Sequence, residues 1–76
     1  MTQKLPRITA AEAIRVLEQV GFFCTRQSGG HKIYKTHGGR RVTVPYHSGK
    51  TLHPKVLRSI LKDADLTVEK LKELMR

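Results

Sequence analysis

The sequence predicts an α+β fold, a two-layer sandwich in which helices cover one face of a three-stranded antiparallel sheet. Apolar residues recur at helical spacing in both terminal thirds of the chain, and three short strand-like runs with Gly-Gly turns lie between them. Two long amphipathic helices are expected to cover one face of this sheet, so its other face or its rim should stay open. At this length we expect residues 1–76 to form a single domain with a small core and a shallow site.

A first helix is predicted between Thr9 and Gly21, after a short extended lead-in over residues 1–8. Thr9 and Glu12 have the spacing of a capping box, in which each side chain accepts a backbone N–H from the other residue. Gly21 is expected as the C-terminal cap, because glycine tolerates a positive φ. The apolar stripe of this helix consists of Ala13, Ile14, Leu17 and Val20.

Three strands are predicted over residues 22–27, 31–36 and 40–44. Gly-Gly pairs follow Ser28 and His37, and such short turns indicate an antiparallel meander. Pro45 should end the third strand.

The direction of His31 depends on strand alternation, which puts it on the same side as Ile33 and puts Lys32 with Tyr34. If Ile33 faces the helices, His31 avoids the core only by lying beyond the last paired residue. We expect that arrangement, because the Gly-Gly turn ends just before His31.

Two further helices are predicted in the last third of the chain. His53-Pro54 starts the first of them, with Pro54 at the first helical position, where its missing N–H costs nothing. Its buried stripe consists of Leu57, Ile60, Leu61 and Ala64. Asp65-Leu66 interrupts the pattern, and Thr67 caps a short last helix with an apolar side formed by Val68, Leu71, Leu74 and Met75.

The charge of the chain is concentrated in its middle. The formal net charge is +9, and no Asp or Glu occurs between Glu18 and Asp63. That span contains all four histidines and the basic residues Arg26, Lys32, Lys35, Arg40, Arg41, Lys50, Lys55, Arg58 and Lys62. A stretch with one sign of charge attracts polyanions, so we expect a nucleic-acid surface rather than a merely solvated face.

The cysteine and the apolar runs indicate the compartment. Cys24 is the only cysteine and follows Phe22 and Phe23, so we expect a buried structural thiol in a reducing environment. No apolar run approaches the ~20 residues of a membrane span, and residues 1–7 lack the apolar core of a signal peptide. We therefore expect a cytoplasmic protein without membrane contacts.

The first candidate for chemistry is the turn over residues 28–31 with the strand that follows it. Backbone amides beside Gly29 and Gly30 are free to receive phosphate oxygens. A histidine side chain can take or give a proton at physiological pH, as RNA cleavage by the 2′-OH requires of its acid or base, so His31 is a candidate for that role. We expect Lys32 and Lys35, or nearby arginines, to stabilise the extra charge of the transition state. An ordinary surface histidine beside a turn stays open as the alternative.

The second candidate is the loop over residues 45–50, with His53 beyond it. A basic loop before a helix N-terminus favours phosphate, although a plain connection stays equally open. Gly49 and the two residues after it are similar to the end of a Walker A motif, but Val44 stands where that motif needs glycine. We expect no metal site, because the histidines lack a ligand spacing and the region lacks carboxylates.

Three blocks of the sequence together resemble the HicA (YcfA-like) family of mRNA interferase toxins. The blocks are Gly29-Gly30-His31-Lys32-Ile33-Tyr34, Val44-Pro45-Tyr46-His47-Ser48-Gly49-Lys50 and Leu57-Arg58-Ser59-Ile60-Leu61-Lys62. An opening helix that ends in Gly21-Phe22 also fits, and the resemblance covers about residues 7 to 66. One departure is Gly30, which stands where the family has a serine.

The resemblance implies a fold like the double-stranded-RNA-binding domain, α-β-β-β-α, here extended by a short C-terminal helix. It also implies the toxin of a type II toxin–antitoxin system, a metal-independent endoribonuclease that cleaves mRNA, uses no cofactor and pairs with a HicB-type antitoxin. The family's catalytic histidine corresponds to His31. The RNA-binding residues that we expect around it are Arg26, Gly29, Gly30, Lys32, Lys35, His47 and Lys50.

Two other readings of the basic surface stay open. One is a non-catalytic module that binds structured RNA through phosphate and 2′-OH contacts. The other is a ribosome-associated or DNA-binding protein that uses the helix after Pro54, although no helix-turn-helix pairing precedes that helix.

Overall fold

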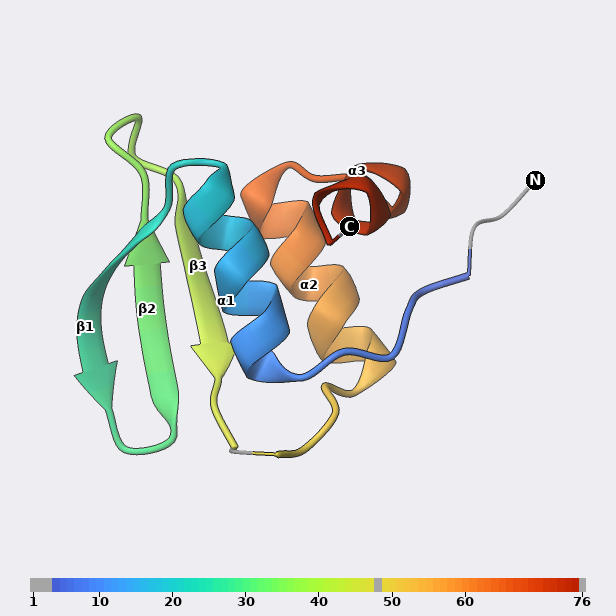
Figure 1. The fold of residues 1–76 in the computed structure, drawn as a ribbon. Helices are drawn as coiled ribbons and strands as arrows, with labels where there is room; N and C mark the ends of the chain where they lie inside the picture. The colour runs from blue at the N-terminus through green and yellow to red at the C-terminus, as the bar shows by residue number, and fades with distance from the viewer. Residues whose placement is uncertain (1–3, 48, 76) are drawn as a thin grey trace.

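The computed structural model describes residues 4–47 and 49–75. It contains a helix, three strands and two further helices in the predicted order, which confirms the α+β arrangement with its short C-terminal helix (Figure 1). The elements are α1 (Ala10–Gln19), β1 (Phe23–Ser28), β2 (His31–Lys35), β3 (Arg41–Pro45), α2 (Pro54–Ala64) and α3 (Val68–Leu74). No helix within the described ranges is long and apolar enough to cross a membrane.

The three strands form one antiparallel sheet in the order β1-β2-β3. The helices all lie to one side of the sheet, with α3 farthest from the strands, and the opposite face is uncovered (Figure 1). The β1–β2 turn and the end of β3 lie at the lower edge of the sheet in this view, near the starts of α1 and α2. The β2–β3 turn lies at the upper edge.

Two groups of buried side chains hold the layers together. The group between the sheet and the helices consists of Ala10, Ile14, Leu17, Phe22, Tyr34, Val42, Val44, Ile60 and Ala64. The group among the helices consists of Ile8, Ala13, Val16, Leu57, Leu61 and Leu71. The apolar stripes predicted for α1 and α2 thus lie in the core, except that Val20 is half-buried against it, because burying apolar side chains removes their surface from water.

The sheet turns Tyr34 toward the helices and Ile33 away from them, contrary to our expectation. Tyr34 is 3% exposed and pairs with Val42, which is fully buried, whereas Ile33 pairs with Thr43 and stays half-buried. The two valines of β3 set this register, because a shift by one residue would turn them out to solvent. His31 therefore lies on the open face even though it pairs with both Ser28 and Pro45, so the expectation that it lies beyond the paired residues is wrong.

Strand β1 is exposed along its whole length, so the expectation of a buried Cys24 thiol is also wrong. Cys24 pairs with Tyr34 across the sheet, and a bulge follows it before Arg26. The helices pack over the other edge strand, β3, and do not reach far enough to cover β1. The Cys24 Sγ contacts the carbonyl oxygen of Arg26 at 3.6 Å.

The ends of the helices follow the sequence signals closely. Thr9 and Glu12 form the predicted capping box, with the Thr9 N–H donating to Glu12 Oε1 at 2.9 Å. The cap of α1 is Val20, one residue before the predicted Gly21, and Gly21 follows it with the expected positive φ, 95°. Thr67 caps α3 as predicted. In β3, Pro45 is the last residue of the strand rather than the residue after it.

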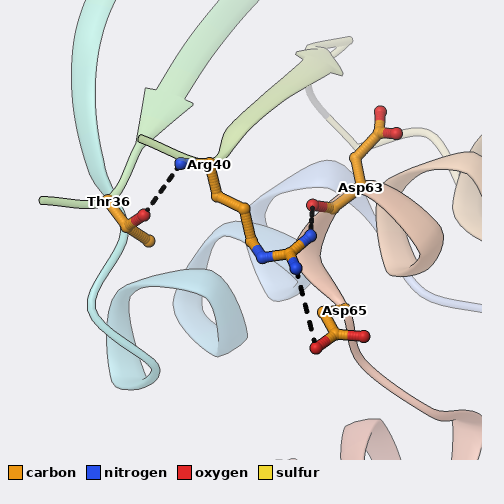
Figure 2. Close-up of polar contacts among 4 residues, drawn as sticks. All are labelled: Thr36, Arg40, Asp63 and Asp65. Atoms are coloured by element: carbon orange, nitrogen blue, oxygen red, sulfur yellow. Dashed lines mark hydrogen bonds and ion pairs between the residues drawn. The ribbon is translucent and has the colours of Figure 1, made fainter. Parts of the chain in front are cut away.

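Arg40 joins the upper edge of the sheet to the C-terminal end of α2 (Figure 2). Its Nη1 donates to the carbonyl oxygen of Asp63 at 3.1 Å, and its Nη2 lies 3.7 Å from the Asp65 carboxylate. The Arg40 N–H donates to Thr36 Oγ1 within the β2–β3 turn. A cation at the C-terminal end of a helix complements the free carbonyls there. Arg40, although part of the basic stretch of the sequence, therefore makes its contacts within the protein.

Candidate active site

His31 begins β2 at the lower edge of the sheet, directly after the Gly29-Gly30 turn. Gly29 has a φ of 55°, which favours glycine and lets the turn reverse the chain in two residues. The His31 side chain is exposed on the uncovered face and pairs across to Ser28 and Pro45. The imidazole is therefore open to solvent without any rearrangement of the fold.

Basic side chains share the open face with His31. His31, Ile33 and Lys35 alternate along β2 and so lie on one face. Residues directly opposite in an antiparallel pair also share a face, and here Arg26 pairs with Ile33 while Arg41 pairs with Lys35. The predicted residues Arg26 and Lys35 are thus brought to the face of His31. Arg41 was not among the residues expected at the site. The alternation along β3, in which Val42 and Val44 are buried, was the signal that Arg41 faces the other way.

Lys32 lies on the other side of the sheet, away from His31. It pairs with Val44 on the helix-facing side, and its Nζ lies 4.2 Å from the centre of the Tyr46 ring. A cation held over an aromatic face is attracted by the ring quadrupole. The structure therefore separates Lys32 from Arg26 and Lys35 and places it against the segment that follows β3.

His47 lies beside the glycine turn. The Tyr46 N–H donates to the Gly30 carbonyl oxygen at 2.6 Å, and this bond fixes the segment after β3 to the turn. A Cβ added to Gly30 would lie 3.5 Å from His47 Cε1. His47 is therefore close to the turn that carries His31, and Ser48 lies outside the described residues.

A groove extends from this point to the start of α2. It has a volume of about 290 Å3 and is lined by Pro45, His47, Lys50, Thr51, Leu52, His53 and Val56. Backbone bonds hold its walls, since Thr51 bridges to Thr9 and the Leu52 N–H donates to the Ile8 carbonyl oxygen at 2.8 Å. His53 was named beside the second candidate loop but not among the expected RNA-binding residues, and Val56 was in neither set, because their place in the groove depends on how α2 docks beside β3.

His53 is also the N-cap of α2. Its Nδ1 accepts the backbone N–H of Lys55 at 3.1 Å, which satisfies one of the free donors of the first helical turn. His47 and His53 thus both line the groove, together with Pro45, the residue that pairs with His31 in the sheet. Within residues 4–47 and 49–75, no three or more His, Cys, Asp or Glu side chains are grouped so that they could hold a metal ion.

The sequence matches a known family over most of this framework. A family model described as the HicA toxin of bacterial toxin–antitoxin systems matches residues 10–66. The match runs from the start of α1 to the residues after α2 and includes every candidate residue of the site, whereas α3 lies beyond it. The comparison with curated proteins gave no match.

Proposed function

The chain belongs to the HicA toxin family of bacterial toxin–antitoxin systems, and from that premise we propose that it is an endoribonuclease that cleaves mRNA with His31 as general acid or base. The observation that carries the proposal is the position of His31, exposed on an open sheet face beside basic side chains. A flat, cationic face suits a long anionic polymer better than a small substrate, which favours an enclosed pocket.

The proposed reaction is attack of a ribose 2′-hydroxyl on the adjacent phosphorus. The bond from phosphorus to the 5′-oxygen of the next nucleotide breaks, and a 2′,3′-cyclic phosphate forms. His31 takes the proton of the 2′-hydroxyl or protonates the leaving 5′-oxygen, and water handles the other proton. Arg26 and Lys35 stabilise the extra negative charge of the transition state. Since the nucleophile belongs to the RNA, the reaction uses no metal-activated water.

The remaining expected residues would hold the RNA near His31. Amides at Gly29 and Gly30 suit phosphate oxygens, and His47 and Lys50 extend the basic edge beyond the turn. Lys32 acts indirectly, because its contact with Tyr46 keeps that edge in place. We propose that the whole chain works as one HicA-like domain.

A family member of this kind acts with an antitoxin partner. We propose that this partner is a HicB-type protein that covers the open sheet face and so blocks access to His31. The cationic face requires an acidic surface on that partner. The proposed substrate implies that toxin and antitoxin meet in the cytoplasm.

A second candidate function is a non-catalytic module that binds structured RNA. Two observations favour it: Gly30 replaces the serine of the family, and no carboxylate between Glu18 and Asp63 is available to orient the His31 imidazole. Such a module would use the same basic face through phosphate and 2′-OH contacts.

The deciding experiment is cleavage of an end-labelled mRNA in EDTA by the wild-type protein and by His31→Ala. The proposal predicts a rate about 100-fold to 10,000-fold lower for His31→Ala, the usual size of acid–base catalysis, with RNA binding retained. The matched control is His37→Ala, which removes an exposed histidine in the β2–β3 turn, at the other end of β2 from His31. Wild-type fragments should end in cyclic phosphate.

Two results would decide against this nuclease. If wild-type protein binds the RNA without cutting it, the binding module replaces the enzyme. If His31→Ala cuts as fast as the wild type, another group performs the chemistry.

A further inference from the structure

We propose that the groove between the end of β3 and the start of α2 holds a nucleobase of the RNA strand, next to the phosphate that is cleaved at His31. This inference rests on the proposed function and adds a recognition subsite to it. The groove is the one described above, lined by Pro45, His47, Lys50, Thr51, Leu52, His53 and Val56.

The size and lining of the groove suit a single flat base. Its volume of about 290 Å3 is just below the roughly 300 Å3 at which sites for larger ligands begin. Leu52 and Val56 give it an apolar, half-buried floor, and the imidazoles of His47 and His53 supply the flat rings on which splayed bases stack. A double helix does not fit, so the occupant is one unpaired base.

His53 also brings a hydrogen-bond donor to the lining of the groove. Its Nδ1 already accepts the Lys55 N–H, so the neutral ring carries its proton on Nε2. Nucleobases offer ring-nitrogen and carbonyl acceptors at their edges, which match this donor. The helix cap therefore selects the tautomer that a base can use.

The groove is continuous with the proposed catalytic turn. Pro45 lines the groove and pairs directly with His31 in the sheet. His47 lies between the groove and Gly30, as the 3.5 Å approach to the position of an added Cβ indicates. An RNA strand that crosses the open face at His31 thus reaches the groove by passing over the same sheet edge.

Charge and rigidity favour RNA as the occupant. Lys50 lines the groove, and none of the lining residues is acidic. The Thr9–Thr51 bridge and the bond from Leu52 to Ile8 hold the walls before any ligand arrives. A preformed subsite loses little ordering entropy on binding.

The first test is an NMR titration of the wild-type protein with each of the four nucleoside 5′-monophosphates, and with inorganic phosphate alone. The proposal predicts saturable shifts of the Leu52 and Val56 methyl signals and of the His53 ring, with little change at His37. Shifts of the same size with inorganic phosphate, or nucleotide shifts confined to the open face, would overturn it.

The second test uses His53→Asn, which keeps a good helix cap while removing the ring. It should weaken nucleotide binding by about tenfold, the scale of one lost base–aromatic contact. In RNA cleavage it should raise KM and flatten the preference for the base beside the cut, whereas His37→Ala leaves both unchanged. An unaltered cleavage pattern would refute the subsite.

The two proposals fail separately. If nucleotides bind in the groove but the protein cuts no RNA, the subsite is supported and the nuclease activity is not. If cleavage depends on His31 but does not change in His53→Asn, the nuclease activity is supported and the subsite is not.

Discussion

Gly30 is a residue at which a side chain can be added without backbone strain. Its φ is not in the left-handed region, in contrast to that of Gly29, and an added Cβ would meet His47 Cε1 at an ordinary contact distance of 3.5 Å. A glycine at this point is therefore a chemical difference from the family's serine rather than a requirement of the turn.

We predict that Gly30→Ser folds normally and cleaves RNA faster than the wild type. The serine hydroxyl would stand beside His47 and add a donor near the incoming phosphate. Gly30→Ala is the matched control, because it adds the Cβ without the hydroxyl and should show no gain. Initial cleavage rates and melting temperatures check this, and equal rates for the two variants would show that the hydroxyl contributes nothing.

Tyr34 makes stability depend on pH in the alkaline range. Burial raises the pKa of its hydroxyl above the ordinary 10.0, and the nearby Cys24 raises it further. Since the folded pKa is above the unfolded one, the stabilisation is fully present below about pH 10 and is lost as the pH rises through the folded pKa.

We therefore predict that the melting temperature falls as the pH rises above about 10 and that Tyr34→Phe makes this fall smaller. Phenylalanine keeps most of the buried ring and removes the ionisable group. Tyr46→Phe serves as the comparison, because Tyr46 is only half-buried. Identical pH profiles for wild type and Tyr34→Phe would show that Tyr34 is not the group responsible.

At the scale of the element, α2 depends on an unusual N-cap. His53 precedes Pro54 with a φ of −63° and a ψ of 141° and accepts the Lys55 N–H on its ring nitrogen. Loss of a capping acceptor leaves a helix donor unsatisfied, at a typical cost of about 0.5–2 kcal/mol.

We predict that His53→Ala lowers the free energy of unfolding by about 1 kcal/mol, whereas His53→Asn changes it little. Asparagine offers a side-chain oxygen for the same N–H. Urea unfolding of the three proteins measures the difference. A similar loss for both variants would mean that His53 stabilises the protein through its groove contacts rather than as a cap.

At the scale of the whole molecule, the basic residues fall into two sets with different tasks. Arg26, Lys35 and Arg41 stand on the open face without an acidic residue in the central stretch of the chain. Arg40 is bonded to the C-terminal end of α2 at the opposite edge. Formal net charge alone does not distinguish these sets.

We predict that RNA affinity falls steeply with salt, because each neutralised phosphate releases counterions. Lys35→Ala and Arg41→Ala should each reduce the slope of log affinity against log salt by about one, the change expected when one phosphate contact is lost. Arg40→Ala should leave the slope unchanged and lower only stability. Affinities measured at several salt concentrations test this, and a slope near zero for the wild type would contradict a phosphate-binding face.

Local signals in the sequence determined the elements and the chemical groups of this protein. The capping box at Thr9, the glycine after α1, the proline at the start of α2 and the apolar stripes are set by backbone sterics and helical spacing within a few residues. The sequence also identifies Arg26, His31 and Lys35 as candidates, because their chemical groups and their places beside the glycine turn do not depend on the fold.

Only the tertiary structure decided which way these groups face. Ile33 and Tyr34 are adjacent and both apolar, so the choice between them depended on the pairing with Val42 and on where the helices pack. That choice turned His31 and Lys32 to opposite sides and left Cys24 exposed on an uncovered edge. The groove has the same origin, because its walls come from β3, a loop and α2, and docking between elements is a property of the whole packed chain.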